Sequence, residues 1–369
     1  MSGSDSGPTT RKILPTHSAS QEKTVATASG QEALSDGREP NANANRRYRV
    51  LGVIGEGANG HVYLAVREQA HLSQYVAIKV LRRKNPEEVL GLHREAAMMA
   101  SLHHPLFPRL LDLTTFGHRQ ALVMEWLPGL SLSQAVRRAG RMPASVALEI
   151  VAELANGIRA LHDRADALGG SAVHCDLKPG NIQIGPFGSV HLMDLGSARC
   201  QGAQWTASTH PYSAPELYKG TASPAVDVFS LGVVLLALLT RLPGRTITSP
   251  EKAARYRRAQ LKRFPRGTQR DVLGLIRRMI HEDAEQRPTA HAVEVDCRRM
   301  QRGLDGPCIA EWASNEVSDH VPTIAKEGVL TGLHVIVLPG SRAMTKTVVE
   351  DLQLPAINQP FSAPAGRLR

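Results

Sequence analysis

The pattern of hydrophobic and polar positions changes at about residue 129. From residue 48, the short β-branched runs YRVLGVIGEG, GHVYLAVRE and YVAIKVLRR are separated by glycine or polar turns, which is typical of consecutive antiparallel strands. LLDLTTFG and QALVMEWL predict two more strands. Farther along, SLSQAVRRAG and PASVALEIVAELANGIRALHDR carry apolar residues at helical spacing. The pattern therefore predicts a strand-rich part followed by a helix-rich part.

One helix is expected within the strand-rich part. It follows Pro86, which suits a first helical position, and its sequence is EEVLGLHREAAMMASL. Its apolar face comprises Val89, Leu92, Ala96 and Met99. In the helix-rich part, three further apolar repeats predict helices at about 224–240, 268–281 and 289–301.

Both ends of the chain depart from this folded pattern. Residues 1–45 contain no Phe, Tyr or Trp, so they cannot bury enough apolar surface to offset their ordering entropy, and we expect a disordered arm. Residues 302–369 form an extension of unpredicted fold, with one strand-like stretch, GVLTGLHVIVL. The expected folded domain is therefore 46–301, divided into lobes at 46–128 and 129–301.

Charge and composition narrow the classes of function. The 369 residues carry 44 Lys plus Arg against 34 Asp plus Glu, and this net charge of +10 favours anionic partners. No apolar run approaches the length of about 20 residues that a membrane-spanning helix needs. The first residues lack the basic and apolar parts of a secretory leader, so we expect a cytoplasmic protein without a membrane segment. Four cysteines without C-x-x-C spacing indicate reduced thiols.

A glycine-rich turn lies between the first two expected strands. Gly55, Gly57 and Gly60 have the spacing G-x-G-x-x-G, and such glycines let backbone N–H groups approach phosphates. A strand follows, which argues against a dinucleotide-binding unit, and no P-loop Lys-Ser or Lys-Thr follows the last glycine. Taken alone, an ordinary glycine-rich hairpin explains the spacing equally well.

A lysine on the third expected strand adds weight to the phosphate hypothesis. Val76-Ala77-Ile78-Lys79 places an ammonium group next to the glycine turn, where it can reach the α- and β-phosphates of a nucleotide. Glu95 lies 16 positions later on the expected helix. We expect Glu95 to pair with Lys79 and to hold it in place.

The string His174-Cys-Asp-Leu-Lys-Pro-Gly-Asn181 carries the groups that phosphoryl transfer needs. Asp176 can accept a proton from an attacking hydroxyl, and Lys178 can neutralise charge on the phosphoryl group. Asn181 can coordinate a divalent ion. Asp194 adds a second oxygen ligand for Mg²⁺. Found in this order behind the glycine turn and the lysine, these residues indicate phosphoryl transfer from a nucleotide.

In these residues and their order, the chain resembles the eukaryotic-type (Hanks-type) serine/threonine protein kinases, in the branch found in bacteria, over about residues 48–301. Ala214-Pro215-Glu216 is similar to the end of the family's activation segment. Asp227-Val-Phe-Ser-Leu-Gly232 is similar to its buried helix, whose Asp holds the catalytic loop. Arg287 fits the arginine that pairs with Glu216 in a structural ion pair.

This resemblance implies an α+β, two-lobed fold, with a small antiparallel-sheet N-lobe holding one helix and a larger, mainly helical C-lobe. It also implies a protein kinase that transfers the γ-phosphoryl group of ATP to Ser or Thr hydroxyls of protein substrates. Autophosphorylation and a role in signalling are further expectations, and the cofactors would be ATP with Mg²⁺ or Mn²⁺.

Residue roles follow from the same resemblance. The catalytic residues would be Asp176, Lys178 and Asn181, and the metal ligands Asn181 and Asp194. Met124 would be the gatekeeper, and the backbone of Glu125 and Leu127 would bind the edge of the adenine ring. The expected ATP site comprises Ile54, Gly55, Glu56, Gly57, Ala58, Asn59, Gly60, His61, Val62, Ala77, Lys79, Glu95, Met124, Glu125 and Leu127. The expected activation segment contains Thr206, Ser208, Thr209 and Glu216.

The chain departs from the family pattern at Cys175 and Leu195, at His210 and Pro211, and in a longer stretch between His162 and His174. Cys175 stands where the family has an arginine that pairs with a phosphorylated activation loop, so we expect activity that does not depend on that pairing. The thiol is either a small buried hydrophobe or a redox-sensitive group. Leu195 replaces a Phe and keeps an apolar side chain there.

Residues 241–270 are dense in Arg and Lys and contain one acid, Glu251. Two interpretations stay open for this stretch, a solvated face and a docking site for an acidic partner. No nucleic-acid recognition motif is present, so we expect no nucleic-acid partner. The pattern does not predict the oligomeric state.

Two other functions would use part of the same set of residues. A catalytically weak pseudokinase scaffold would bind nucleotide without transferring phosphate, and the complete set of catalytic residues argues against it. A small-molecule phosphotransferase of related fold would share the His-x-Asp string and the metal-binding Asp. Such enzymes generally lack the Ala-Pro-Glu segment and its arginine partner.

Overall fold

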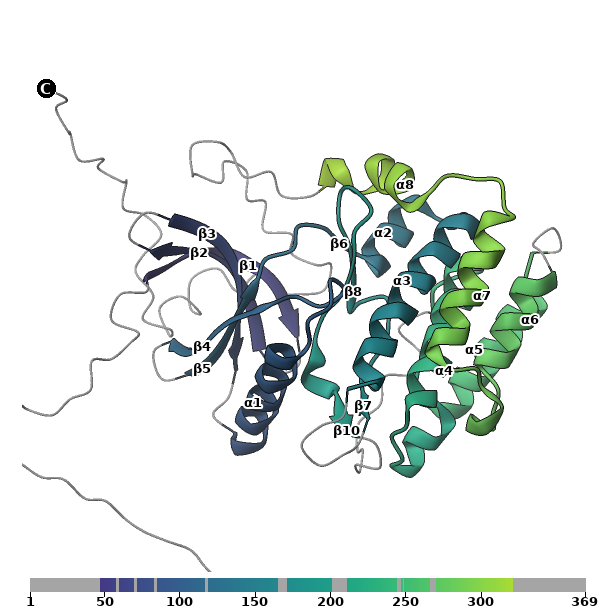
Figure 1. The fold of residues 1–369 in the computed structure, drawn as a ribbon, viewed down its shortest axis with the longest axis horizontal. Coiled ribbons are helices and arrows are strands. Elements are labelled where there is room, and N and C mark those ends of the chain that lie inside the picture. The colour runs from purple at the N-terminus through teal and green to yellow at the C-terminus, as the bar shows by residue number, and fades with distance from the viewer. Residues whose placement is uncertain are drawn as a thin grey trace, which may run out of the picture. The chain divides into compact units, whose positions relative to one another are not determined.

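The computed structural model describes residues 47–320 except 58–59, 70–71, 83–84, 117–118, 165–170, 201–210, 244–246, 248 and 266–269. The arm expected at 1–45 and the strand-like stretch at 328–338 lie outside the described residues. Figure 1 shows a sheet with one helix beside it, followed by a group of helices. This arrangement confirms the predicted two-lobed α+β fold.

The N-lobe sheet contains five antiparallel strands in the order β1-β2-β3-β5-β4. Their bounds are β1 Arg47–Gly57, β2 Gly60–Gln69, β3 Leu72–Leu81, β4 Leu110–Phe116 and β5 Arg119–Glu125. Successive side chains of a strand point to opposite faces. On β3, Ala77 therefore packs in the main core while Ile78 packs in a smaller cluster on the other face. The register pairs Lys79 with Val62 and Ala77 with Met124, so these four predicted site residues lie on neighbouring strands.

Helix α1 (Pro86–Ser101) interrupts the strands where the sequence predicts it. The side chain of Asn85 caps it by accepting a hydrogen bond from the backbone N–H of Glu87 (3.0 Å), and Pro86 occupies the first turn. Its buried face comprises Leu92, Glu95, Ala96 and Met99. The predicted apolar stripe thus carries one acid, Glu95, into the interior.

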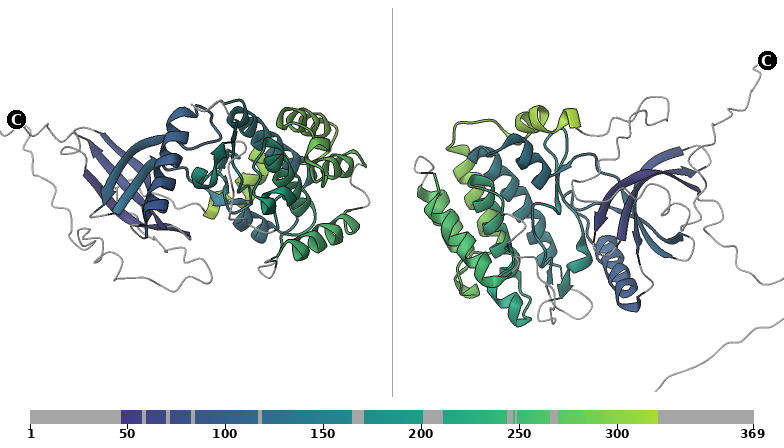
Figure 2. Two further views of the ribbon diagram at one scale, coloured as in Figure 1. Left: turned by 90° about the horizontal axis from the view of Figure 1, so that it is seen from below. Right: turned by 180° about the vertical axis from the view of Figure 1, so that it is seen from behind.

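The centre of the C-lobe is made by α3 (Ala144–His162) and α4 (Pro224–Leu239), which pack against each other. Residues 226–239 of α4 are all buried, so this helix forms the inner part of the core. Figure 2 shows the other helices around this pair. They are α2 (Leu132–Ala139), α5 (Pro250–Lys262), α6 (Arg270–Met279) and α7 (Ala290–Arg302), with the short strands β6 Leu130–Ser131, β7 Ala172–Val173, β8 Ile182–Ile184, β9 Val190–Leu192 and β10 Arg199–Cys200.

The helices predicted at 224–240, 268–281 and 289–301 correspond to α4, α6 and α7, and these predictions are confirmed. Helix α5 was not predicted. Its buried positions are Ala253, Arg257 and Gln260, so its inward face shows no apolar stripe in the sequence. A helix whose inward face is partly polar gives no periodic hydrophobic signal.

The first part of the C-terminal extension packs on the C-lobe. Helix α8 (Ile309–Glu316) buries Ile309, Trp312 and Ala313, and the Ile309 N–H donates to Glu149 of α3 (2.8 Å). Beyond the helix, Ser318 donates to the carbonyl of Pro186 in the β8–β9 turn (3.0 Å). Residues 303–320 therefore brace the hairpin that leads to the candidate site. In the described ranges, no helix combines the length and apolar character that crossing a membrane requires.

Candidate active site

A loop between β7 and β8 carries Asp176, and α4 holds this loop from inside the C-lobe. The fully buried carboxylate of Asp227 accepts hydrogen bonds from the backbone N–H groups of His174 (2.8 Å) and Cys175 (2.9 Å). Its Oδ2 also lies 2.9 Å from Nε2 of His162. Cys175 has a φ of 65°, a left-handed conformation that costs energy for a residue with a side chain. The buried carboxylate offsets that cost and fixes the direction of the loop.

Two neighbours orient the Asp176 carboxylate. Nζ of Lys178 donates to Oδ2 of Asp176 (2.6 Å), and Nδ2 of Asn181 donates to the same oxygen (3.1 Å) and to the Asp176 carbonyl (2.9 Å). The three predicted catalytic residues therefore lie together. Because Oδ2 is engaged by both neighbours, Oδ1 is the oxygen left to meet an incoming hydroxyl.

Lys79 of β3 joins carboxylates from both lobes. Its Nζ lies 2.7 Å from Oε2 and 2.9 Å from Oε1 of Glu95, and 2.7 Å from Oδ1 of Asp194. Burial alone would lower the pKa of Lys79, but the two carboxylates outweigh it and raise the pKa above its ordinary value. Lys79 is therefore charged and fixed in position.

The two carboxylates respond to this lysine differently. Burial raises the pKa of Glu95 above its ordinary value, although Lys79 opposes the change. Burial also disfavours the charged form of Asp194, but the ammonium of Lys79 overcomes it and holds the pKa of Asp194 below its usual range. The side chain of Glu95 is 3% exposed and that of Asp194 is 45% exposed. Glu95 thus depends on Lys79 for its charge, while Asp194 has one side open to a ligand.

Asp194 and Asn181 form an oxygen-rich pair beside this lysine. The backbone N–H of Met193 donates to the carbonyl of Asn181 (2.8 Å), which brings the two side chains to adjacent positions. The amide nitrogen of Asn181 is used by Asp176, so its amide oxygen is the atom left for a cation. One carboxylate and one amide oxygen are hard ligands, and this donor set fits Mg²⁺ or Mn²⁺.

The glycine turn joins β1 to β2, and Gly57 pairs with Gly60 across it. A Cβ at Gly60 would lie 2.1 Å from the carbonyl oxygen of Val80, so packing against β3 alone requires glycine there. This reason is separate from the phosphate contact inferred from the sequence. Gly55 pairs with Val62, while Ala58 and Asn59 lie outside the described residues.

The other residues predicted to bind the nucleotide differ in burial and in their hydrogen bonds. Ala77 and Met124 are buried on adjacent strands, Val62 is partly buried beside the same core, and Ile54 is 39% exposed.

At the hinge, the N–H of Glu125 donates to the Arg109 carbonyl (2.9 Å), and the carbonyl of Leu127 accepts from the Gln183 side chain. On the glycine turn, Glu56 accepts from Arg82 (2.7 Å) and lies 3.5 Å from the buried His61, whose pKa is lowered by burial and by Arg82.

The end of the expected activation segment is fixed by an ion pair. Arg287 makes two bonds to the carboxylate of Glu216, at 2.5 and 2.9 Å, and its guanidinium lies 4.8 Å from the ring centre of Phe229. The pair expected from the sequence is thus present. Thr206, Ser208 and Thr209 lie outside the described residues.

The basic stretch 241–270 is not a solvated face throughout. Arg257 is 7% exposed, donates to the carbonyl of Pro211 (3.2 Å) and lies 5.0 Å from the ring centre of Phe229. The exposed basic side chains of α5 are Lys252, Arg255, Arg258 and Lys262. Burial lowers the pKa of Arg257, and the negative charge of Glu282 opposes this change in part.

Three supporting residues have no role assigned by the sequence pattern. His162 ends α3 and contacts Asp227, and Gln183 contacts the hinge. A Cβ on Gly196 would lie 3.1 Å from Oδ1 of Asp194 and 3.2 Å from Oε2 of Glu95, so glycine keeps the junction of the two lobes tight. The contacts of His162 and Gln183 join residues 65 and 56 positions apart, and no local spacing signals such contacts.

Comparisons with known proteins agree with this geometry. The sequence profile of the family described as "Protein kinase domain" matches residues 48–296. The chain is 31% identical over 278 residues to serine/threonine-protein kinase PknB of Mycobacterium leprae, a match that covers 70% of this chain and 43% of that protein. It is 30% identical over 267 residues to serine/threonine-protein kinase PrkC of Bacillus subtilis, covering 68% and 40%.

The matched part spans less than half the length of these two relatives. The family profile, in contrast, covers both lobes of the described fold, from β1 into α7. The chain therefore belongs to the protein kinase family, within its branch of serine/threonine kinases known from bacteria.

Proposed function

We propose that this chain is an active serine/threonine protein kinase, which transfers the γ-phosphoryl group of ATP to Ser or Thr hydroxyls of protein substrates and of its own chain. The observation that carries the proposal is the contact of Lys79 with both Glu95 and Asp194. This contact joins the phosphate-binding lysine of the N-lobe to the metal-binding carboxylate of the C-lobe. Family members require both groups in place for transfer.

The nucleotide would lie between the lobes. Ala77, Val62 and Ile54 would contact the adenine ring, and Met124 would be the gatekeeper. The hinge groups assigned to the adenine edge are the carbonyl of Glu125 and the N–H of Leu127. The Glu125 N–H and the Leu127 carbonyl already bond to Arg109 and Gln183, which supports this choice.

In the transfer step, Oδ1 of Asp176 accepts the proton of the acceptor hydroxyl. The hydroxyl oxygen forms a bond to the γ-phosphorus while the bond from that phosphorus to the β–γ bridging oxygen breaks, and ADP leaves. Lys178 and Lys79 would offset negative charge on the phosphates. A divalent ion held by Asn181 and Asp194 would supply further charge neutralisation.

We also propose that phosphorylation of Thr206, Ser208 or Thr209 is not needed to align the catalytic loop. Asp227 already bonds the backbone of Cys175, the residue that replaces the usual phosphate-reading arginine. Because the reaction consumes ATP, we assign the kinase domain to the cytoplasm.

Asp176→Asn tests the proposal, with Asp305→Asn on an exposed surface as the matched control. Each protein is incubated with ATP, Mg²⁺ and a generic basic protein, and phosphosites are mapped by mass spectrometry. We expect Asp176→Asn to lower the transfer rate by about 10²–10⁴-fold, because a positioned general base contributes that much, and the control to match the parent.

Other outcomes would contradict the proposal. Nucleotide binding by the parent without any transfer would identify a pseudokinase scaffold. Phosphate found on aminoglycosides or choline instead of Ser and Thr would identify a small-molecule phosphotransferase. Transfer by Asp176→Asn at the parent rate would remove Asp176 from the mechanism.

A further inference from the structure

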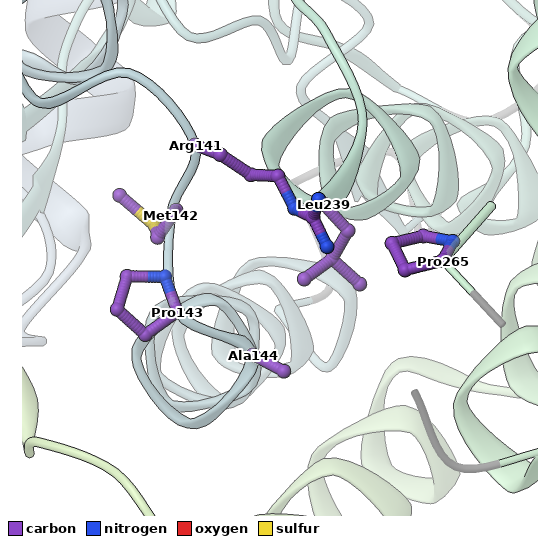
Figure 3. Close-up of a pocket in the computed structure, with 6 residues that line it drawn as sticks. All are labelled: Arg141, Met142, Pro143, Ala144, Leu239 and Pro265. Carbon is purple, nitrogen blue, oxygen red and sulfur yellow. The ribbon is translucent and has the colours of Figure 1, made fainter. Parts of the chain in front are cut away.

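A surface pocket of about 400 Å³ lies in the C-lobe, outside the residues assigned to catalysis. Its lining comes from three separate segments: the connection between α2 and α3 with the first residue of α3, the end of α4, and the residues after α5. Figure 3 shows Arg141 extending across it towards Leu239, with Pro265 on the far side. The other lining residues are Met142, Pro143 and Ala144. Apart from the Arg141 head group, the lining side chains are apolar.

The segments that meet at this pocket carry positive charge without any acid. Residues 126–148, 228–250 and 252–270 contain no Asp or Glu, whereas each contains Arg or Lys. Among the exposed side chains, Arg141 lines the pocket. Lys262 ends α5, and Arg263 follows it, two residues before the pocket residue Pro265. Like charges held together in this way produce a positive potential around the apolar centre.

Helix α5 also reaches the residues just before the Ala-Pro-Glu segment. Arg257, in the middle of α5, donates to the carbonyl of Pro211 (3.2 Å). Tyr256 in turn donates to the carbonyl of Arg241 (2.5 Å). The middle of α5 therefore contacts both the chain after α4 and Pro211, three residues before Ala214.

We propose that this pocket and its basic rim, formed by Arg141, Lys262 and Arg263, bind an acidic segment of a partner protein through one apolar side chain seated in the pocket. Charge complementarity favours an acidic chain over a neutral one. The apolar lining gives an anchor to a side chain such as Leu, which a nucleic acid does not have. Arg257 takes no part, because its guanidinium is buried against Phe229. Binding here needs neither nucleotide nor Asp176, so it can be measured separately from phosphoryl transfer.

The test uses the full chain carrying Asp176→Asn and short fluorescent peptides rich in Glu and Asp. One peptide has a central Leu, a second has Ser in its place, and binding is followed by fluorescence anisotropy. The double variant Arg141→Glu/Arg263→Glu reverses the rim, Ala144→Phe fills the pocket, and Arg302→Glu reverses an exposed charge at the end of α7 as the control.

We expect the Leu peptide to bind more tightly than the Ser peptide. The rim variant should weaken the binding of both peptides by about tenfold or more, and Ala144→Phe should remove the preference for Leu. The Arg302→Glu control should bind like the parent. Circular dichroism checks that each variant is folded, and Ala144→Ser provides a second pocket variant that keeps the side chain small and should retain the preference.

Three results would overturn the proposal. Equal binding of the Leu and Ser peptides would show only a solvated basic face. Displacement of the Leu peptide by a single-stranded oligonucleotide at lower concentration than by unlabelled peptide would identify a nucleic-acid surface. Light scattering gives the third test. If the parent is a dimer, the rim variant is a monomer and the Leu peptide does not bind the parent, the occupant is a second copy of the chain.

Discussion

The two lobes hold their proposed catalytic groups in different ways. In the N-lobe, Lys79 is placed by side-chain charges, one from α1 and one from the C-lobe. In the C-lobe, the loop of Asp176 is placed by backbone N–H groups that bond to one fully buried carboxylate, Asp227. The first arrangement depends on the ionisation of its partners, and the second depends on the integrity of the core.

This difference separates what can change during a catalytic cycle from what stays fixed. Helix α1 contributes a single acid to the site, and that acid can part from Lys79 without loss of backbone hydrogen bonds. Releasing Asp227 would leave two buried N–H groups and the partly buried His162 without their partner, which costs far more. We infer that the N-lobe pair is the adjustable part of the site and the C-lobe loop the rigid part.

The largest expected effect is the loss of the rigid part. Asp227→Ala should lower the free energy of unfolding by about 3–5 kcal/mol, because it breaks a buried network that includes His162. Chemical denaturation measures this value. Asp227→Asn keeps one acceptor oxygen and should lose less. A parent-like midpoint for Asp227→Ala would show that the loop does not depend on this carboxylate.

A smaller effect, dependent on pH, is expected at the adjustable pair. Lys79→Met should cost about 1–3 kcal/mol near pH 8, since it leaves the buried Glu95 without its partner. Burial already raises the pKa of Glu95, and without Lys79 that pKa rises further. The folded state then binds more protons than the unfolded state, so stability falls as pH rises from the unfolded value of about 4.3 through the folded pKa.

Denaturation at a series of pH values checks this slope against the parent. The variant Lys79→Met/Glu95→Gln removes the titrating group and should show a flatter profile than Lys79→Met alone. Equal slopes in the single and double variants would mean that Glu95 does not carry the pH dependence. In the parent, the lowered pKa of Asp194 adds stability above its unfolded value, and this contribution is lost as pH falls.

The smallest effect concerns the thiols, which report on how closed the catalytic loop is. Cys175 and Cys297 are buried and Cys308 is exposed, and burial raises the pKa of Cys297 to about 12. In a Cys200→Ser background, iodoacetamide should modify Cys308 first without changing stability. Cys175 and Cys297 should react only as fast as the fold opens.

Peptide mapping by mass spectrometry follows each thiol separately. In Asp227→Ala, Cys175 should become reactive before Cys297, because the loop opens locally. Reaction of Cys175 in the native parent as fast as Cys308 would contradict a rigid loop and would revive the hypothesis of a redox-sensitive thiol. The burial of Cys175 favours the small-hydrophobe interpretation.

Much of the fold follows from local patterns. The strand runs from residue 48 became β1 to β5, and the apolar stripe after Pro86 became α1. Helix α5 escaped prediction because Arg257 occupies one of its buried positions. Helix α8 escaped because it is short, and its burial of Trp312 shows only when the C-lobe is assembled.

By itself, the sequence determined which chemical groups are present and on which element each one lies, because strand and helix periods depend on near neighbours. It also determined the family through the order of the motifs. Only the tertiary structure decided which charges meet: Lys79 with Asp194, 115 residues away, Asp227 with the catalytic loop, and Arg257 with a buried ring instead of solvent. Such pairings depend on how packed elements bring distant segments together, and no local spacing encodes that distance.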